Sequence, residues 1–277
     1  MTIVTPSSIR LRFIHLDQLV LHEEDDPFRV KKLMSSFKHD GKLRNPPIVV
    51  EYGNQYMVLD GVTRTTALIE MGFRDVVVQI VDYFSDMVSL STWCHVVAGI
   101  ASNRLFSNLK ELNNLSIHPI EVGTGLKKLA NREISALIAL RDGREFAVFW
   151  EGDVNLQANC LRELVGVYRG KAQVHRTTEI DLCTLAQQYP ELTAMIVFPR
   201  FKPQEILEIA SNGNKVPMGI TRHIIVGRVL GLSIPLKMLS DEQLLAEKNA
   251  WLEEQIRQRL RANKVRLYQE PVYVFDD

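Results

Sequence analysis

Residues 56–69 read YMVLDGVTRTTALI, in which an apolar strand ends at Asp60-Gly61 and a helix with Arg64 in its first turn follows at once. A helix start offers unpaired N–H groups and the positive end of a dipole, which together favour an anion. Gly61 lets a ligand approach the backbone, while Arg64 and the hydroxyls of Thr63 and Thr65 add donors for phosphate oxygens. The stretch therefore predicts a phosphate-binding loop, although a plain turn capped by Asp60 fits the same residues.

The segments on either side of this loop predict a compact α/β unit that ends near Asp82. A helix is expected over 28–37, with Pro27 in its first turn and Asp40-Gly41 at its end. The hairpin arms 46–50 and 56–59, a helix over 63–71 and a strand over 76–81 follow. The long apolar run of the last strand is typical of burial on both faces.

The rest of the chain predicts further mixed α/β structure, so we expect an α/β (α+β) protein with domains at 1–90 and 91–277. A strand is expected over 194–198, a helix over 203–211, a charged helix over 241–264 capped by Ser240, and an edge strand over 272–275. Residues 216–223, VPMGITRH, form the second dense motif of the sequence.

The composition limits the classes of protein that this chain can belong to. Its 277 residues carry 33 Lys plus Arg and 33 Asp plus Glu, and this balance makes a nucleic-acid partner unlikely. The cysteines, Cys94, Cys160 and Cys183, have neither zinc-site nor disulfide spacing, which favours a reducing compartment. No secretory signal opens the sequence, and no run approaches the roughly 20 apolar residues of a membrane span. We expect a cytoplasmic protein without a membrane partner, and leave a homodimer open.

Two polar clusters are candidates for chemistry. Glu23 belongs to an acidic run before the first helix, where carboxylates either complement the helix dipole or supply a general base. Thr221-Arg222-His223 follows a Pro and a Gly and predicts a clamp for a small anion, with a surface ion pair of Arg222 as the alternative. From the residues alone, Trp93 is expected in the core.

These residues resemble a known family. Residues 11–82 are similar to the ParB/sulfiredoxin-like nucleotide-binding fold, in which a strand–Gly-x-x-Arg–helix junction holds a nucleotide's phosphates. Further blocks follow the order found in the free L-serine kinases, both the SbnI-like bacterial enzymes and the archaeal ADP-dependent ones: His22-Glu23, Asn45–Val50, Asp60–Arg64, Ser91–Trp93, Val216–Arg222 and Val272–Val274.

The resemblance implies phosphorylation of free L-serine to O-phospho-L-serine with ATP or ADP and Mg²⁺, feeding siderophore (diaminopropionate) or cysteine biosynthesis. It implies that Glu23 is the catalytic glutamate and that Asp60 acts in catalysis and holds the metal. The resemblance assigns nucleotide binding to Gly61, Val62, Thr63, Arg64 and Thr65. It assigns binding of the amino acid to Trp93, Thr221 and Arg222, and the residue pattern adds His223 to this group.

One departure from the family keeps other functions open. The family carries a His directly before the loop Arg, whereas this chain has Thr63, which can donate a hydrogen bond but cannot be a cation. A descendant that binds nucleotide without kinase activity, such as a ParB-like DNA-binding regulator, is the main alternative. A sulfiredoxin-like reductase ranks last, because Cys94 lies well downstream of Arg64.

Overall fold

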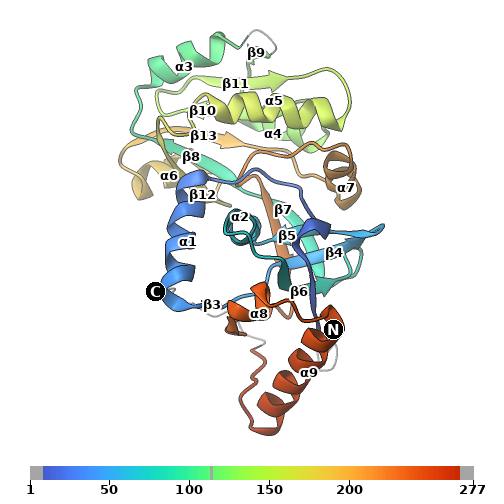
Figure 1. Cartoon of the computed structure of the whole chain (residues 1–277). Helices are drawn as coiled ribbons and strands as arrows, with labels where there is room; N and C mark the ends of the chain where they lie inside the picture. Colours follow the sequence, from blue (N-terminus) through green and yellow to red (C-terminus); the bar gives the residue numbers. More distant parts are fainter. Residues whose placement is uncertain (1–8, 113–114, 269–277) are drawn as a thin grey trace.

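The computed structural model describes residues 9–112 and 115–268, and two β-sheets organise them (Figure 1). The expected mixed α/β class is confirmed. The expected edge strand over 272–275 lies outside the described residues.

The first sheet has the strand order β1-β6-β4-β5-β2. Its strands are β1 Arg10–His15, β2 Leu19–Leu21, β4 Ile48–Tyr52, β5 Gln55–Asp60 and β6 Asp75–Val81. β4 and β5 form the predicted hairpin, and β6 lies between β1 and β4. The sheet is covered on both faces, because alternate residues of β5 enter different cores: Val58 enters one, and Met57 and Leu59 enter the other.

Two helices of this unit begin and end where local chemistry requires. α1 Pro27–Asp40 starts at Asp26, whose carboxylate accepts from the Phe28 N–H, and ends at Gly41 in the left-handed conformation. α2 Val62–Glu70 starts at Gly61, whose φ of 98° is also left-handed. No side chain caps α2, so its first N–H groups point at the end of β5 without a capping oxygen.

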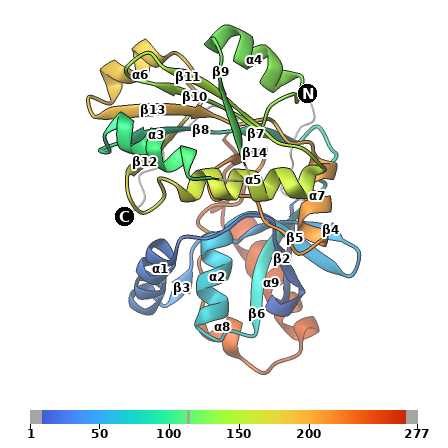
Figure 2. The same cartoon turned by 90° about the horizontal axis from the view of Figure 1, so that it is seen from above.

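The second sheet has the order β12-β8-β13-β10-β11-β9 and lies between two layers of helices (Figure 2). α3, α5 and α7 pack on one face, and α4 and α6 on the other. The strands are β8 Cys94–Ala98, β9 Ser116–Pro119, β10 Ala136–Leu140, β11 Glu145–Phe149, β12 Gln173–Thr177 and β13 Leu192–Val197. The helices are α3 Ser102–Lys110, α4 Val122–Ala130, α5 Val154–Gly166, α6 Leu182–Gln188 and α7 Pro203–Ser211.

A two-stranded antiparallel sheet joins the two units. β7 Val88–Thr92 leaves the first unit and pairs antiparallel with β14 Thr221–Ile225, which returns to it. The apolar core is continuous across this junction, because Ile48 and Met57 of the first sheet belong to the same cluster as Ile138 and Ile196 of the second.

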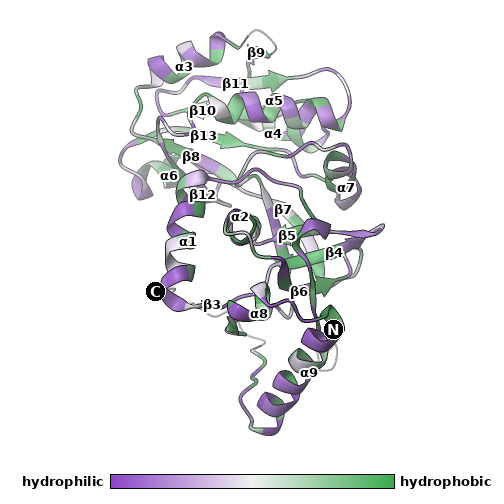
Figure 3. Ribbon diagram, viewed as in Figure 1, coloured by the Kyte–Doolittle hydropathy of each residue, from purple (hydrophilic) through white to green (hydrophobic). Residues whose placement is uncertain are grey.

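The C-terminal part packs back onto the first unit. β15 Ile234–Pro235 pairs with β3 Lys42–Leu43, and the helices α8 Lys237–Ser240 and α9 Leu245–Arg261 follow. The predicted single helix over 241–264 with Ser240 as its cap is wrong: Ser240 ends α8, and α9 begins after Leu244. The cause is tertiary, because the Asp241 carbonyl accepts from the ammonium of Lys248, which is drawn to the carboxylate of Asp75. Figure 3 shows that α9 carries polar residues on its outer side, in keeping with its charged sequence.

Candidate active site

The loop between β5 and α2 has the features that the sequence predicts for an anion site. A Cβ atom on Gly61 would lie 2.8 Å from Nη2 of Arg64, so the Arg64 guanidinium folds back over this glycine. Within the described residues, Arg64 Nε and the hydroxyls of Thr65 and Thr66 are buried and have no hydrogen-bond partner. Buried polar groups are normally satisfied, so these donors indicate that a polar ligand completes the loop.

Asp60 does not cap α2. Its carboxylate lies 2.7 Å from Nη2 of Arg64 and 2.9 Å from Nη2 of Arg228. These two guanidinium groups hold the pKa of Asp60 below its ordinary value despite the opposing effect of burial. Two arginines at an uncapped helix start make the loop strongly cationic apart from this single carboxylate.

Arg228 was not predicted as a site residue from the sequence. It belongs to the segment between β14 and β15. Gln79 of β6 fixes this segment, since its amide donates to the Gly227 carbonyl and accepts from the Val229 N–H. No spacing in the sequence relates Arg228 to Asp60. A weak signal is present in the glycines that flank it, Gly227 and Gly231, which are typical of a segment that closes over a ligand.

Glu23 lies at the junction of the units, where its backbone pairs with Val216 in a parallel bridge. Its Oε1 accepts from the Gly219 N–H at 2.7 Å, and its Oε2 accepts from the Thr221 hydroxyl at 2.7 Å. The structure therefore brings together the acidic run and the 216–223 motif, which the sequence predicted separately. Glu23 is the member of that run that reaches this motif through its side chain, because Asp26 caps α1 and Glu24 pairs with Arg169.

His22 lies beside the hydroxyl that holds Glu23. Its side chain is 1% exposed, and its Nδ1 lies 2.6 Å from the Val58 carbonyl. A carbonyl only accepts, so Nδ1 carries the proton. Nε2 lies 3.1 Å from the oxygen of the Thr221 hydroxyl, whose single proton is donated to Glu23. Burial lowers the pKa of His22, which keeps the ring neutral, although Glu23 and Asp60 act in the opposite direction.

The predicted amino-acid clamp is divided between the two faces of β14. Thr221 and His223 lie on the face that looks at His22, and the His223 ring meets the His22 ring edge-on at 5.1 Å. His223 Nε2 is 2.7 Å from the Tyr83 hydroxyl, and burial holds the pKa of His223 well below its ordinary value. Arg222, between them, belongs to the opposite face, where its guanidinium stacks 4.4 Å from the ring centre of Trp93.

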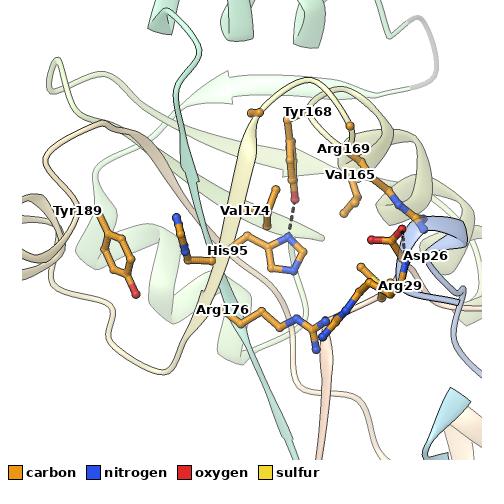
Figure 4. Close-up of a pocket in the computed structure, with 13 residues that line it drawn as sticks. Asp26, Arg29, His95, Val165, Tyr168, Arg169, Val174, Arg176 and Tyr189 are labelled. Atoms are coloured by element: carbon orange, nitrogen blue, oxygen red, sulfur yellow. Dashed lines mark hydrogen bonds between the residues drawn. The ribbon is translucent and has the colours of Figure 1, made fainter. Parts of the chain in front are cut away.

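A cavity of about 650 Å³ opens next to the 216–223 segment, of which Met218 is part of the lining (Figure 4). Its walls come from the start of α1, the end of α5, β12 and the 216–223 segment. The polar residues that line it are Asp26, Arg29, His95, Tyr168, Arg169, His175, Arg176 and Tyr189. The cavity is thus rich in cationic groups, and sequence analysis predicted none of them as site residues.

Comparisons with known proteins match this geometry to one family. No family model matches the sequence. The chain is 29% identical over 273 residues to the ATP-dependent L-serine kinase SbnI of Staphylococcus aureus, covering 96% of this chain and 97% of that protein. The chain is thus similar over nearly its whole length to an SbnI-like free L-serine kinase. A second relative, the ATP-dependent L-serine kinase of Staphylothermus marinus, is 33% identical over 112 residues, which are 40% of this chain and 44% of that protein.

Solved structures of this family share the fold. A C-terminally truncated SbnI from Staphylococcus aureus has a TM-score of 0.72 and 24% identity, covering 90% of this chain and 96% of that one. A free serine kinase in complex with AMP has a TM-score of 0.69 and 21% identity, covering 83% and 93%. Both structural units of the present chain therefore occur in the family's solved members.

The cysteines do not resemble a redox site. Cys94 and Cys160 are buried, and burial raises the pKa of each thiol to about 11, so neither is a ready nucleophile. Cys183 is exposed on α6. Among the residues that the structure describes, the sulfiredoxin-like alternative thus has no supporting geometry.

The described residues contain neither a cluster of metal ligands nor a helix that could span a membrane. They contain no group of three or more His, Cys, Asp or Glu side chains that could hold a metal ion. Across the same residues, no helix is both long enough and apolar enough to cross a membrane.

Proposed function

We propose that this protein phosphorylates free L-serine to O-phospho-L-serine with ATP, at the junction between its two units. The observation that carries the proposal is the Glu23 carboxylate, which the Gly219 N–H and the Thr221 hydroxyl hold in place near the uncapped start of α2. A fixed carboxylate beside a phosphate-binding loop is what transfer of a phosphoryl group to an alcohol requires.

Glu23 is the general base. It takes the proton of the serine hydroxyl as the serine oxygen forms its bond to the terminal phosphorus of ATP. The bond from that phosphorus to the bridging oxygen breaks, and ADP leaves with the electron pair. The Thr221 hydroxyl and the Gly219 N–H hold the carboxylate in place, and neutral His22 packs beside Thr221. Near-fixed geometry of this kind lowers the barrier because the site needs little reorganisation.

The nucleotide's phosphates bind at the start of α2. No side chain caps the N–H groups of Gly61, Val62 and Thr63 there, and Arg64 supplies a fork of donors. The unpartnered hydroxyl of Thr65 supports this assignment. Thr63 stands in the position of the family's His and contributes a hydroxyl in place of an imidazole.

Asp60 is the one carboxylate of the loop that fits Mg²⁺. Protein sites for nucleotide-bound Mg²⁺ use one or two carboxylates together with phosphate oxygens and water. Both Asp60 oxygens accept from arginines, so a phosphate that draws Arg64 or Arg228 away would free an oxygen for the metal. When bound, Mg²⁺ would neutralise phosphate charge.

The amino acid lies in the space in front of Glu23, bordered by Thr221 and His223, with Trp93 and Arg222 on the reverse side of β14. The boundary of two domains near residue 90, a cytoplasmic location and a homodimer stay predictions. Use of the product in siderophore or cysteine biosynthesis also stays a prediction.

The direct test is phosphorus NMR of the purified protein with L-serine, Mg²⁺ and either ATP or ADP. We expect a phosphomonoester signal that grows with ATP and is absent without L-serine. If neither nucleotide gives phosphoserine although calorimetry shows that the protein binds it, the kinase assignment is rejected and the chain is a nucleotide-binding descendant.

A further inference from the structure

We propose that Arg176, assisted by Arg29, binds the carboxylate of the amino acid that this enzyme phosphorylates, in the cavity beside Glu23. This inference rests on the proposed function and deepens it, since it names the group that selects an amino acid from among other alcohols. It also moves the carboxylate site from Arg222, where the sequence placed it, to a strand that carries no recognised motif.

The arginines of the cavity differ in whether they have an acidic partner. Arg169 is satisfied, because it lies 2.7 Å from Glu24 and also bonds to the Asp25 carbonyl. Within the described residues, Arg29 and Arg176 form no ion pair, yet the side chains of both converge in the cavity (Figure 4). Burial lowers the pKa of Arg176, and the charge of Arg29 lowers it further. Two neighbouring cations without a carboxylate partner favour an anionic ligand between them.

Arg176 lies close to Gly219, the glycine that holds the proposed general base Glu23. A Cβ atom on Gly219 would lie 2.6 Å from Arg176 Nε, so the guanidinium lies directly over this glycine. The N–H of the same glycine donates to Glu23. Arg176 is close enough for Glu23 to raise its pKa, but the two form no ion pair. Arg176 and Glu23 thus both contact Gly219, so a small molecule bound to Arg176 at this glycine would lie near the base.

The stereochemistry of serine suits this spacing. Its hydroxyl-bearing carbon and its carboxyl carbon are attached to the same α-carbon, so a serine whose hydroxyl contacts Glu23 must place its carboxylate nearby. Arg176 lies next to Gly219 and meets this condition, whereas Arg222 extends from the opposite face of β14 to Trp93. Arginine's planar fork matches a carboxylate in two parallel hydrogen bonds.

Hydrogen bonds of His95 fix the part of the cavity wall next to Arg176. Arg176 lies opposite His95 in the pairing of β12 with β8. His95 Nε2 is 3.0 Å from the Gly219 carbonyl and must donate to it, while Nδ1 is 2.8 Å from the Tyr168 hydroxyl and accepts. His95 thus holds Gly219, which contacts both Glu23 and Arg176, against the second sheet. It is therefore a positioning residue.

The test combines variants with a substrate analogue. Steady-state rates are measured for the wild type, Arg176→Gln, Arg176→Lys and Arg222→Gln, the variant of the competing carboxylate site, each with L-serine and with L-serinamide, which lacks the carboxylate charge. We expect Arg176→Gln to raise the KM for L-serine about 10- to 100-fold, the range for losing hydrogen bonds to a charged group. The KM for ATP should stay within about twofold. With L-serinamide, Arg176→Gln and the wild type should be nearly equal, and Arg176→Lys should recover part of the loss.

Three results would overturn the inference. An equal rise in the KM for ATP would mean that Arg176 binds phosphate. A loss as large with L-serinamide as with L-serine would mean a general structural role, and a serine-specific loss in Arg222→Gln but not in Arg176→Gln would return the carboxylate to Arg222. If the wild type makes no phosphoserine, the proposed function fails on its own. Calorimetric titration of L-serine into the wild type and Arg176→Gln then decides the carboxylate site separately, and equal affinities reject it.

Discussion

Replacing Glu23 with glutamine should remove catalysis while leaving the fold intact. The carboxylate accepts two hydrogen bonds, from the Gly219 N–H and from the Thr221 hydroxyl. In Glu23→Gln the amide oxygen can still accept from Gly219, and the amide NH₂ would donate to the Thr221 oxygen. The Thr221 hydroxyl can then rotate to donate to His22 Nε2, which is 3.1 Å away. Every polar group at the junction keeps a partner, so the substitution removes only the ability to accept a proton.

The magnitude follows from the loss of the base. General-base catalysis typically contributes about 10²- to 10⁴-fold, or about 3–5 kcal/mol of the activation barrier. We expect kcat to fall by this factor, with the KM for ATP and the melting temperature close to wild-type values. Initial rates of phosphoserine formation and thermal unfolding followed by circular dichroism measure both quantities.

A matched control is Glu51→Gln, which makes the same chemical change in an exposed carboxylate that pairs with Arg10 on the first sheet. It should have wild-type kcat. The reasoning is refuted if Glu23→Gln keeps kcat within about threefold of the wild type. A variant that loses activity together with several degrees of melting temperature would show that Glu23 acts through the structure of the junction.

Three further predictions concern binding and stability. Arg64→Ala and Arg228→Gln should each weaken ATP binding at least about tenfold, as expected for lost hydrogen bonds to a charged group; calorimetric dissociation constants equal to wild type would remove these residues from the nucleotide site. Lys248→Met should lower the free energy of unfolding by about 3–5 kcal/mol, because it leaves the carboxylate of Asp75 buried without its cation. In urea unfolding, Lys248→Met combined with Asp75→Leu should recover much of that loss, and an additive effect would contradict this explanation. Burial lowers the pKa of His95 from 6.5 to about 4. Between these pH values the unfolded chain therefore binds a proton on this side chain that the folded chain does not bind. Stability should therefore fall by about 3 kcal/mol as the pH drops from 6.5 to 4, and His95→Gln should abolish this component.

The first unit could be predicted closely because its signals are local. Asp26, Pro27 and Gly41 mark the two ends of α1, and the step from an apolar run to Asp60-Gly61 marks the start of α2. These residues act on their immediate neighbours in the chain, so no knowledge of the tertiary structure is needed. The helix over 203–211 was predicted with its observed bounds for the same reason, with a proline in its first turn.

The missing parts of the site depend on contacts between distant segments. Glu23 meets Gly219 and Thr221 across nearly 200 positions, as the separations of 196 and 198 show. The motifs at both ends were found from the sequence, but their pairing was supplied by family resemblance. Arg176 and Arg228 belong to no motif and reach the junction through β12 and through a segment fixed by Gln79. Strand periodicity would have shown that Arg222 and Thr221 face opposite ways, had the bounds of β14 been known.

The ion pair between Asp75 and Lys248 has a consequence for the order of events during synthesis. Both side chains are fully buried, and they are separated by 173 positions in the chain. When a ribosome has released the first sheet, Lys248 has not yet been made, and within that unit His15 Nδ1 lies 2.6 Å and Arg74 Nε lies 3.9 Å from the Asp75 carboxylate. A nascent first unit would therefore hold an under-compensated carboxylate until the end of the chain emerges. The nucleotide loop, which lies on the same sheet, would reach its final stability last, so an incomplete chain would be a poor competitor for ATP.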